Sequence, residues 1–174
     1  MAGARADVDE WVLAARPGEV GGDVGARKHL QLNERFVSLI RGRNGGLHCL
    51  DSVCYHAGGP LLIGDVEDVN GVECIRCPWH AYPVRLVDGA KPYKRLHVMP
   101  DGTLGRASWE LSERRQRVHM VDERADGVWV RLTSDARVDR HAEGAECESD
   151  RWAYRESAGR NVLRHGGPLK HAKY

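Results

Sequence analysis

Two short segments, each with one cysteine and one histidine in a loop rich in glycine or proline, constrain this chain most strongly. The first contains Cys54 and His56, and the second contains Cys77 and His80. Thiolate and imidazole groups are good metal ligands, and each segment directly follows a run of residues with β-strand character. Two loops of one small β fold could bring the four side chains to a single point. The sequence therefore predicts a metal centre held by two loops.

The rest of the region between residues 11 and 133 has the pattern of an all-β domain. Short apolar and β-branched runs alternate with turns rich in Gly, Asn, Asp and Pro, which is typical of successive short strands. The predicted strands cover residues 35–40, 47–50, 72–76, 84–87, 117–121 and 128–132. Hairpins join the first two and the last two, because Asn-Gly-Gly and Asp-Gly sequences lie between them. We expect a small β-sandwich or barrel.

One internal segment departs from this pattern. In residues 105–115, Ser108 could cap a short helix that has Glu110 and Glu113 in its first turns. The same residues are equally consistent with an insertion loop.

The C-terminal part of the chain has few large aliphatic residues after residue 134. Such a segment buries too little apolar surface to offset the entropy lost on ordering. We therefore expect one domain at residues 9–134 and a charged, poorly ordered tail at residues 135–174. The alternative for the tail is a partner-binding segment anchored by Trp152 and Tyr154.

Composition excludes several classes of function. The 26 basic and 25 acidic residues give a net charge of +1, which provides no basis for binding nucleic acid or an anionic membrane. No apolar run approaches the roughly 18 residues of a membrane-spanning helix. The acidic N-terminus does not fit a signal peptide, and five cysteines do not suggest a disulfide scaffold. We expect a monomeric, cytoplasmic protein with reduced thiols.

Two other kinds of metal site could use these donors. A Cys₂His₂ zinc site would take the same four side chains, although structural zinc sites usually pair Cys with Cys and His with His. An all-thiolate site would combine two of the predicted ligands, Cys54 and Cys77, with Cys49 and Cys74. Against this, Cys49 and Cys74 lie in predicted strands, where small buried residues are expected, and both histidines would have no role.

The arrangement C-x-H…C-x-x-H, with Gly after the first pair and Pro within the second, resembles the ligand signature of the Rieske [2Fe–2S] family. The likeness is sharpest around the two segments and extends more loosely over residues 9–134. The sequences of these segments are most similar to those of small soluble Rieske-type ferredoxins, which lack an oxygenase domain. The resemblance implies one cluster, with Cys54 and Cys77 on the buried iron and His56 and His80 on the outer iron.

The resemblance also implies roles for neighbouring residues. Gly58 and Gly59 would let backbone N–H groups approach the cluster sulfides, with plain turn glycines as the alternative. Pro78 would stiffen the second loop. Trp79 would shield the cluster or form a docking surface, with core packing as the alternative. Pro92 would belong to a third loop that covers the cluster.

Departures from the family pattern bear on the reduction potential. Rieske subunits of respiratory complexes carry a second cysteine in each loop and form a disulfide across the cluster, whereas this chain has Gly59 and Trp79 at those positions. They also carry a Ser and a Tyr that donate hydrogen bonds to sulfur, where this chain has Tyr82 and Val84. We expect a potential toward the lower end of the roughly −150 to +300 mV Rieske range.

The function that the resemblance implies is soluble, ferredoxin-like electron transfer between a reductase and an oxygenase or similar acceptor. The chain is too short for an added oxygenase domain and carries no nucleotide-binding fingerprint, so we expect an electron carrier without catalysis of its own. The alternatives are an accessory subunit of a Rieske oxygenase complex and a zinc-binding structural or interaction module.

Overall fold

The computed structural model describes residues 10–133 and 147–153, and these residues are organised almost entirely as β-strands, as expected. The strands are β1 (Val12–Ala15), β2 (Arg27–Leu32), β3 (Arg35–Arg41), β4 (Leu47–Asp51), β5 (Val66–Val69), β6 (Val72–Arg76), β7 (Pro83–Arg85), β8 (Ala90–Val98), β9 (Leu104–Arg114), β10 (Val118–Arg124) and β11 (Gly127–Arg131). Two short 3₁₀ helices, η1 (Leu61–Ile63) and η2 (Glu148–Arg151), complete the fold. Among these residues, no helix has the length and apolar character needed to cross a membrane.

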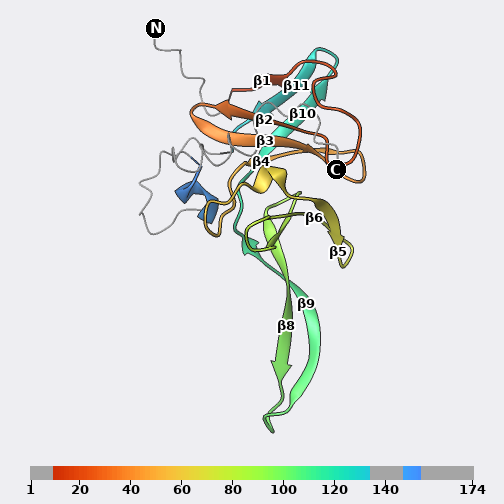
Figure 1. Ribbon diagram of the computed structural model, residues 1–174, viewed down its shortest axis with the longest axis vertical. Helices are drawn as coiled ribbons and strands as arrows, with labels where there is room; N and C mark the ends of the chain where they lie inside the picture. Colours follow the sequence, from red (N-terminus) through yellow and green to blue (C-terminus); the bar gives the residue numbers. More distant parts are fainter. Residues whose placement is uncertain (1–9, 134–146, 154–174) are drawn as a thin grey trace.

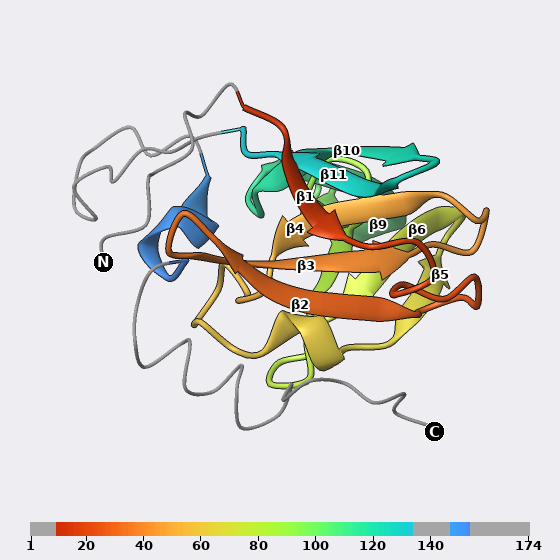
Figure 2. The same ribbon diagram turned by 90° about the horizontal axis from the view of Figure 1, so that it is seen from above.

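The principal sheet has six strands in the order β1-β11-β10-β4-β3-β2, and all neighbouring strands are antiparallel. It curls until its edge strands β1 and β2 approach each other, which gives a nearly closed barrel (Figure 2). Alternate side chains of these strands point inward and form the barrel core, because successive strand residues face opposite sides. Val37, Leu39, Cys49 and Val130 are almost completely buried there. The two predicted hairpins are confirmed as β3–β4 and β10–β11.

A second, three-stranded sheet of order β5-β6-β7 lies below the barrel (Figure 1). Its buried side chains share a core with the outer face of the principal sheet. Ile40 and Leu50 come from β3 and β4, and Ile75 and Val84 come from β6 and β7. The loops that follow β4 and β6 rest on this shared core, so the two predicted metal-binding segments start from a common, rigid base.

A long two-stranded arm, β8–β9, projects from the molecule away from the barrel (Figure 1). Neither alternative for residues 105–115, a short helix or an insertion loop, is correct, because Ser108 lies in the middle of β9. Ala107, Trp109 and Leu111 alternate with Ser108 and Glu110. That period of two suits a strand, since it places the apolar residues on one face.

Seven residues of the predicted tail form η2 and its flanks. The expectation of a loosely attached tail is wrong for them, because Cys147, Ser149 and Ala153 are each at most 1% exposed. The backbone N–H of Phe36 donates to the carbonyl of Ala153 at 3.1 Å, which ties this segment to β3. The remaining tail residues, including Tyr154, lie outside the described ranges.

Candidate metal centre

The two loops that carry the predicted ligands share one backbone hydrogen-bond pattern. Cys54 donates its N–H to the carbonyl five residues later at 2.8 Å and accepts from the N–H four residues later at 2.9 Å. Cys77 makes the same two bonds, both at 2.9 Å. The fifth residue of each loop, Gly58 or Ala81, takes a positive φ of 71° or 55°. Each loop therefore closes into a tight turn directly after its cysteine.

These turns bring the four predicted ligands together as two pairs. Cys54 and Cys77 are 1% exposed each, and their side chains are hydrogen-bonded to one another. His56 and His80 are both exposed, and their Nδ1 atoms lie 3.3 Å apart. The two imidazole planes meet at 90° with ring centroids 4.7 Å apart. The thiols thus form the inner end of the site and the imidazoles form its outer end.

Local hydrogen bonds favour the thiolate at the inner end. The pKa of Cys77 is lowered to about 6, mainly because the Cys54 thiol donates a hydrogen bond to the Cys77 sulfur. The backbone N–H groups of Trp79 and His80 lower it further, whereas burial opposes the shift. The same thiol contact is the main cause that raises the pKa of Cys54, with burial adding to it. Since the thiolate is the metal-binding form of cysteine, the site already stabilises one ligand in that form.

The predicted neighbours of the first loop lie against the site in different ways. A Cβ atom at Gly59 would lie 3.2 Å from the Cys77 sulfur and 3.0 Å from the Trp79 ring. Gly59 and Trp79 are therefore adjacent across the two loops. A Cβ atom at Gly58 would come within 2.7 Å of the Trp152 ring. Gly58 is thus required both for its positive φ and for the close approach of η2.

In the second loop, Pro78 and Trp79 lie at the surface beside His80. Trp79 is 47% exposed, which fits a surface position better than the core packing that was the alternative. The apolar indole therefore flanks the exposed imidazole pair.

Tyr82 and Lys91 are the side chains that link the site to the arm. The Tyr82 ring centroid lies 4.5 Å from that of His56, and the Lys91 ammonium lies 3.6 Å from the centre of the Tyr82 ring. Pro92 is not in a loop, contrary to the prediction, because it lies in β8 opposite Leu111. Its neighbour Lys91 is the β8 residue that reaches the site.

Two side chains that the sequence did not assign to the metal centre fix the backbone of the first loop. Gln116 is fully buried, accepts from the Tyr55 N–H at 2.8 Å and donates to the carbonyls of Asp51 and Val53 at 3.0 and 2.7 Å. Trp152 donates from its indole N–H to the Tyr55 carbonyl at 3.0 Å. Both backbone groups of the residue between the predicted ligands are therefore held by distant side chains.

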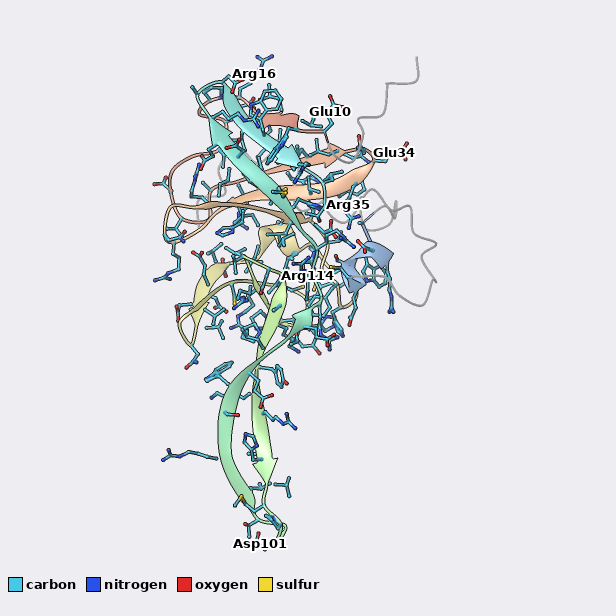
Figure 3. All side chains as sticks on the ribbon, turned by 180° about the vertical axis from the view of Figure 1, so that it is seen from behind. Glu10, Arg16, Glu34, Arg35, Asp101 and Arg114 are labelled. Carbon is cyan, nitrogen blue, oxygen red and sulfur yellow. The ribbon has the colours of Figure 1, made fainter. Side chains whose placement is uncertain are left out.

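A buried ion network attaches η2 to the barrel beside this loop. Arg35 donates to Asp51 at 2.6 and 2.7 Å and to Asp150 at 2.5 Å, and Arg117 donates to Asp150 at 2.7 and 2.6 Å. Burial by itself would raise the pKa of Asp51, but the Arg35 guanidinium outweighs it and holds that pKa well below its usual range. Figure 3 shows Arg35 beside η2. The segment is thus anchored by two arginines of the β domain.

Comparison with known proteins identifies the family. Residues 23–135 match the family model described as soluble Rieske-type ferredoxin. The chain belongs to this Rieske family. A human Rieske domain-containing protein is 31% identical over 137 residues, which cover 75% of this chain and 81% of the relative. The resemblance inferred from the two Cys/His segments is therefore confirmed.

Solved structures align with much of this chain. A 2-oxoquinoline 8-monooxygenase component aligns with a TM-score of 0.50 at 19% identity, over 78% of this chain and 29% of that one. A protein described as the small subunit of an NADPH nitrite reductase aligns with a TM-score of 0.49 at 15% identity, over 70% of this chain and 97% of that one. The chain spans about a third of the length of the Rieske monooxygenases it matches, 33% and 34% for two of them.

The donor set of this Rieske protein fits the cluster that its family implies. A Rieske centre takes two cysteines on one iron and two histidines on the other, and the described residues provide one buried sulfur pair and one exposed nitrogen pair. Nowhere in residues 10–133 and 147–153 do three Cys, His, Asp or Glu side chains converge as ligands of a single ion. Cys49 and Cys74 are buried in β4 and β6, as expected of strand residues.

Proposed function

We propose that this protein is a soluble one-electron carrier whose Rieske [2Fe–2S] cluster is held by Cys54, Cys77, His56 and His80. The observation that carries the proposal is the division of the donors into a buried thiol pair and an exposed imidazole pair. When bound, such a cluster takes up and gives back one electron at a time.

The protein residues would insulate one end of the cluster and expose the other. Burial of Cys54 and Cys77 keeps water from the sulfur ligands, and the backbone N–H groups of Trp79 and His80 offset the negative charge of the Cys77 sulfur. The exposed rings of His56 and His80 give an electron the shortest route to the surface. Electrons would therefore enter and leave through the histidine end.

The surroundings favour a potential toward the lower end of the roughly −150 to +300 mV Rieske range. Gly59 and Trp79 meet at the point where the respiratory proteins have a disulfide. Where those proteins have the Ser and the Tyr that donate hydrogen bonds to sulfur, this chain has Tyr82 and Val84 instead. Fewer donors to sulfur leave a reduced, more negative cluster less stabilised.

A reductase and an acceptor such as an oxygenase would complete the electron path. We further propose that the chain acts as a cytoplasmic monomer, with its electron-transfer domain at residues 9–134. The similar monooxygenase component is described in terms of oxidation and reduction of its own Rieske centre, which is in keeping with such a path.

A set of matched cysteine variants tests the ligand set. Cys77→Ala should abolish the visible absorption of the cluster, whereas Cys74→Ala, a buried strand cysteine three residues away, should retain it. His80→Cys should lower the reduction potential if the cluster still assembles, because a thiolate adds negative charge. Equal loss of the cluster in the Cys74 and Cys77 variants would favour the all-thiolate site, and a potential well above +100 mV would contradict the proposed tuning.

A further inference from the structure

The arm formed by β8 and β9 has one face made of apolar side chains. Strand register pairs Leu96 with Ala107 and Val98 with Leu104, and directly opposed residues of antiparallel strands share a face. This apolar face consists of Pro92, Leu96, Val98, Leu104, Ala107, Trp109 and Leu111. Its five largest aliphatic and aromatic side chains are 41–68% exposed. The apolar surface of the described residues is therefore exposed along most of the arm, whereas Pro92 at its base is buried.

The opposite face of the arm is polar and its groups satisfy one another. Tyr93 donates to Glu110 at 2.8 Å, Arg95 pairs with the same carboxylate at 3.4 Å, and His97 bonds with Ser108 at 2.8 Å. A ribbon of two strands is only marginally stable alone, and a contiguous exposed apolar patch marks a site of interaction. Among the residues that the structure describes, none forms a layer over the apolar face.

The charge of the arm indicates what covers it. Residues 90–114 contain five basic and three acidic side chains. Lys94 lies on the apolar face opposite Trp109, with its ammonium 5.2 Å from the indole ring. Within the described residues, no carboxylate is within ion-pair distance of Lys91, Lys94 or Arg114. A second copy would place like charges against one another, because a two-fold interface sets a surface against itself. An acidic partner would instead form ion pairs with these three cations.

The base of the arm borders the proposed electron exit. Leu111, from the apolar face, and Lys91, from the polar face, line a hollow of about 690 Å³ together with His56 and Tyr82. Arg114 borders the same hollow, and Figure 3 shows it at the arm's base, with Asp101 at the far tip. A protein seated on the arm would therefore also reach His56.

We propose that the apolar face, with Lys94 on it and Lys91 and Arg114 at the base of the arm, docks a redox protein whose surface carries an apolar patch ringed by acidic side chains. This inference rests on the proposed function, since it supplies the partner of the same histidine exit. The arm would hold the partner's redox centre toward His56, and the cations would speed the encounter.

Stopped-flow reduction by flavodoxin, a small acidic electron-transfer protein, tests this surface. At low ionic strength, Lys94→Gln should lower the second-order rate constant about threefold, and the double variant Leu96→Thr/Val98→Thr about tenfold. Arg106→Gln is the matched control, because Arg106 precedes Ala107 in β9 and lies on the polar face, and it should stay within about 1.5-fold of wild type. The wild-type rate constant should fall as salt is added.

Two further measurements separate the possible failures. Reduction by dithionite needs no protein docking, so every variant should be reduced at the wild-type rate. If no variant and no wild-type protein contained a reducible cluster, that result would count against the proposed function and not against the docking surface. Titration calorimetry with oxidised flavodoxin measures docking without electron transfer. Equal affinities and rate constants for wild type and the arm variants would overturn the docking proposal. A wild-type dimer that Leu96→Thr/Val98→Thr dissociates in sedimentation would overturn it in favour of self-association.

Discussion

Replacing Asp150 by asparagine removes one of the two carboxylates that face Arg35 and Arg117 in the interior. The side chains of Arg35 and Arg117 are 0% and 2% exposed, and that of Asp150 is 6% exposed. Three charge-assisted hydrogen bonds end on this carboxylate. An asparagine keeps one acceptor oxygen but turns an amide N–H₂ group toward a guanidinium, so Arg35 and Arg117 lose a shared anionic acceptor and one of them faces another donor.

The expected cost is large for a domain of this size. Breaking a buried ion pair by neutralising one partner costs about 3–5 kcal/mol, because the remaining charge stays desolvated. Domains of this kind are stable by only about 5–15 kcal/mol in total. With a urea dependence of about 2 kcal/mol per molar, the unfolding midpoint should fall by about 2 M. The cluster should also be lost sooner, since η2 carries Trp152, which holds the first loop through Tyr55.

Urea unfolding of the cluster-loaded protein, followed by circular dichroism and by visible absorption, measures both effects. Asp122→Asn is the matched control, because Asp122 pairs with Arg124 at 2.7 Å while their side chains remain 47% and 39% exposed. An exposed pair of this kind contributes about 0–1 kcal/mol. If Asp150→Asn shifts the midpoint no more than Asp122→Asn does, the reasoning about η2 as a buried anchor is refuted.

Three smaller perturbations test other parts of the structure by the same unfolding measurement. Ala81→Gly should stabilise the protein by about 0.5 kcal/mol, because glycine removes the strain of φ +55° at a partly offsetting entropic cost; destabilisation would contradict it. Gly64→Ala should destabilise the folded protein by more than about 2 kcal/mol, since the added Cβ would lie 1.9 Å from the Arg76 carbonyl oxygen. The control Gly22→Ala, which has open space around it, should change the stability by less than about 0.5 kcal/mol. Burial lowers the pKa of His29 from 6.5 to about 4, so between these values the unfolded chain binds a proton there that the folded chain does not. Stability should therefore be present above pH 6.5 and decline by about 1 kcal/mol per pH unit toward pH 4, and His29→Gln should flatten that slope; an unchanged slope would show that His29 is not the group responsible.

The parts of the fold that the sequence predicted are those governed by local pattern. The turn sequences at residues 44–46 and 126–127 mark hairpins that the structure contains, because a turn and its flanking strands are specified within a few residues. The pairing of a cysteine with a histidine in each loop is local too. The resemblance already implied that Cys54 and Cys77 lie inside and that His56 and His80 lie outside. The structure has the thiols buried and the imidazoles exposed, and it adds the core beneath the loops that accounts for this division.

The parts that were missed depend on contacts between distant residues. Gln116, Asp150 and Trp152 each act on groups that lie more than 60 residues away in the chain. Nothing in the sequence around Gln116 or Asp150 marks them, and Trp152 was singled out only as an anchor for a partner. β9 was missed for a different reason. Ser108 with its following glutamates imitates a helix start, whereas the alternation around Trp109 has the period of a strand. Here the longer pattern determines the structure.

The claim that two buried thiols and two exposed imidazoles hold a Rieske cluster is tested most directly by electron paramagnetic resonance of the dithionite-reduced protein, combined with iron and sulfide analysis. The account predicts about two irons and two acid-labile sulfides per chain and a reduced signal of the Rieske type, whose g-values reflect mixed nitrogen and sulfur ligation. One zinc per chain, with no iron, no sulfide and no signal, would contradict it.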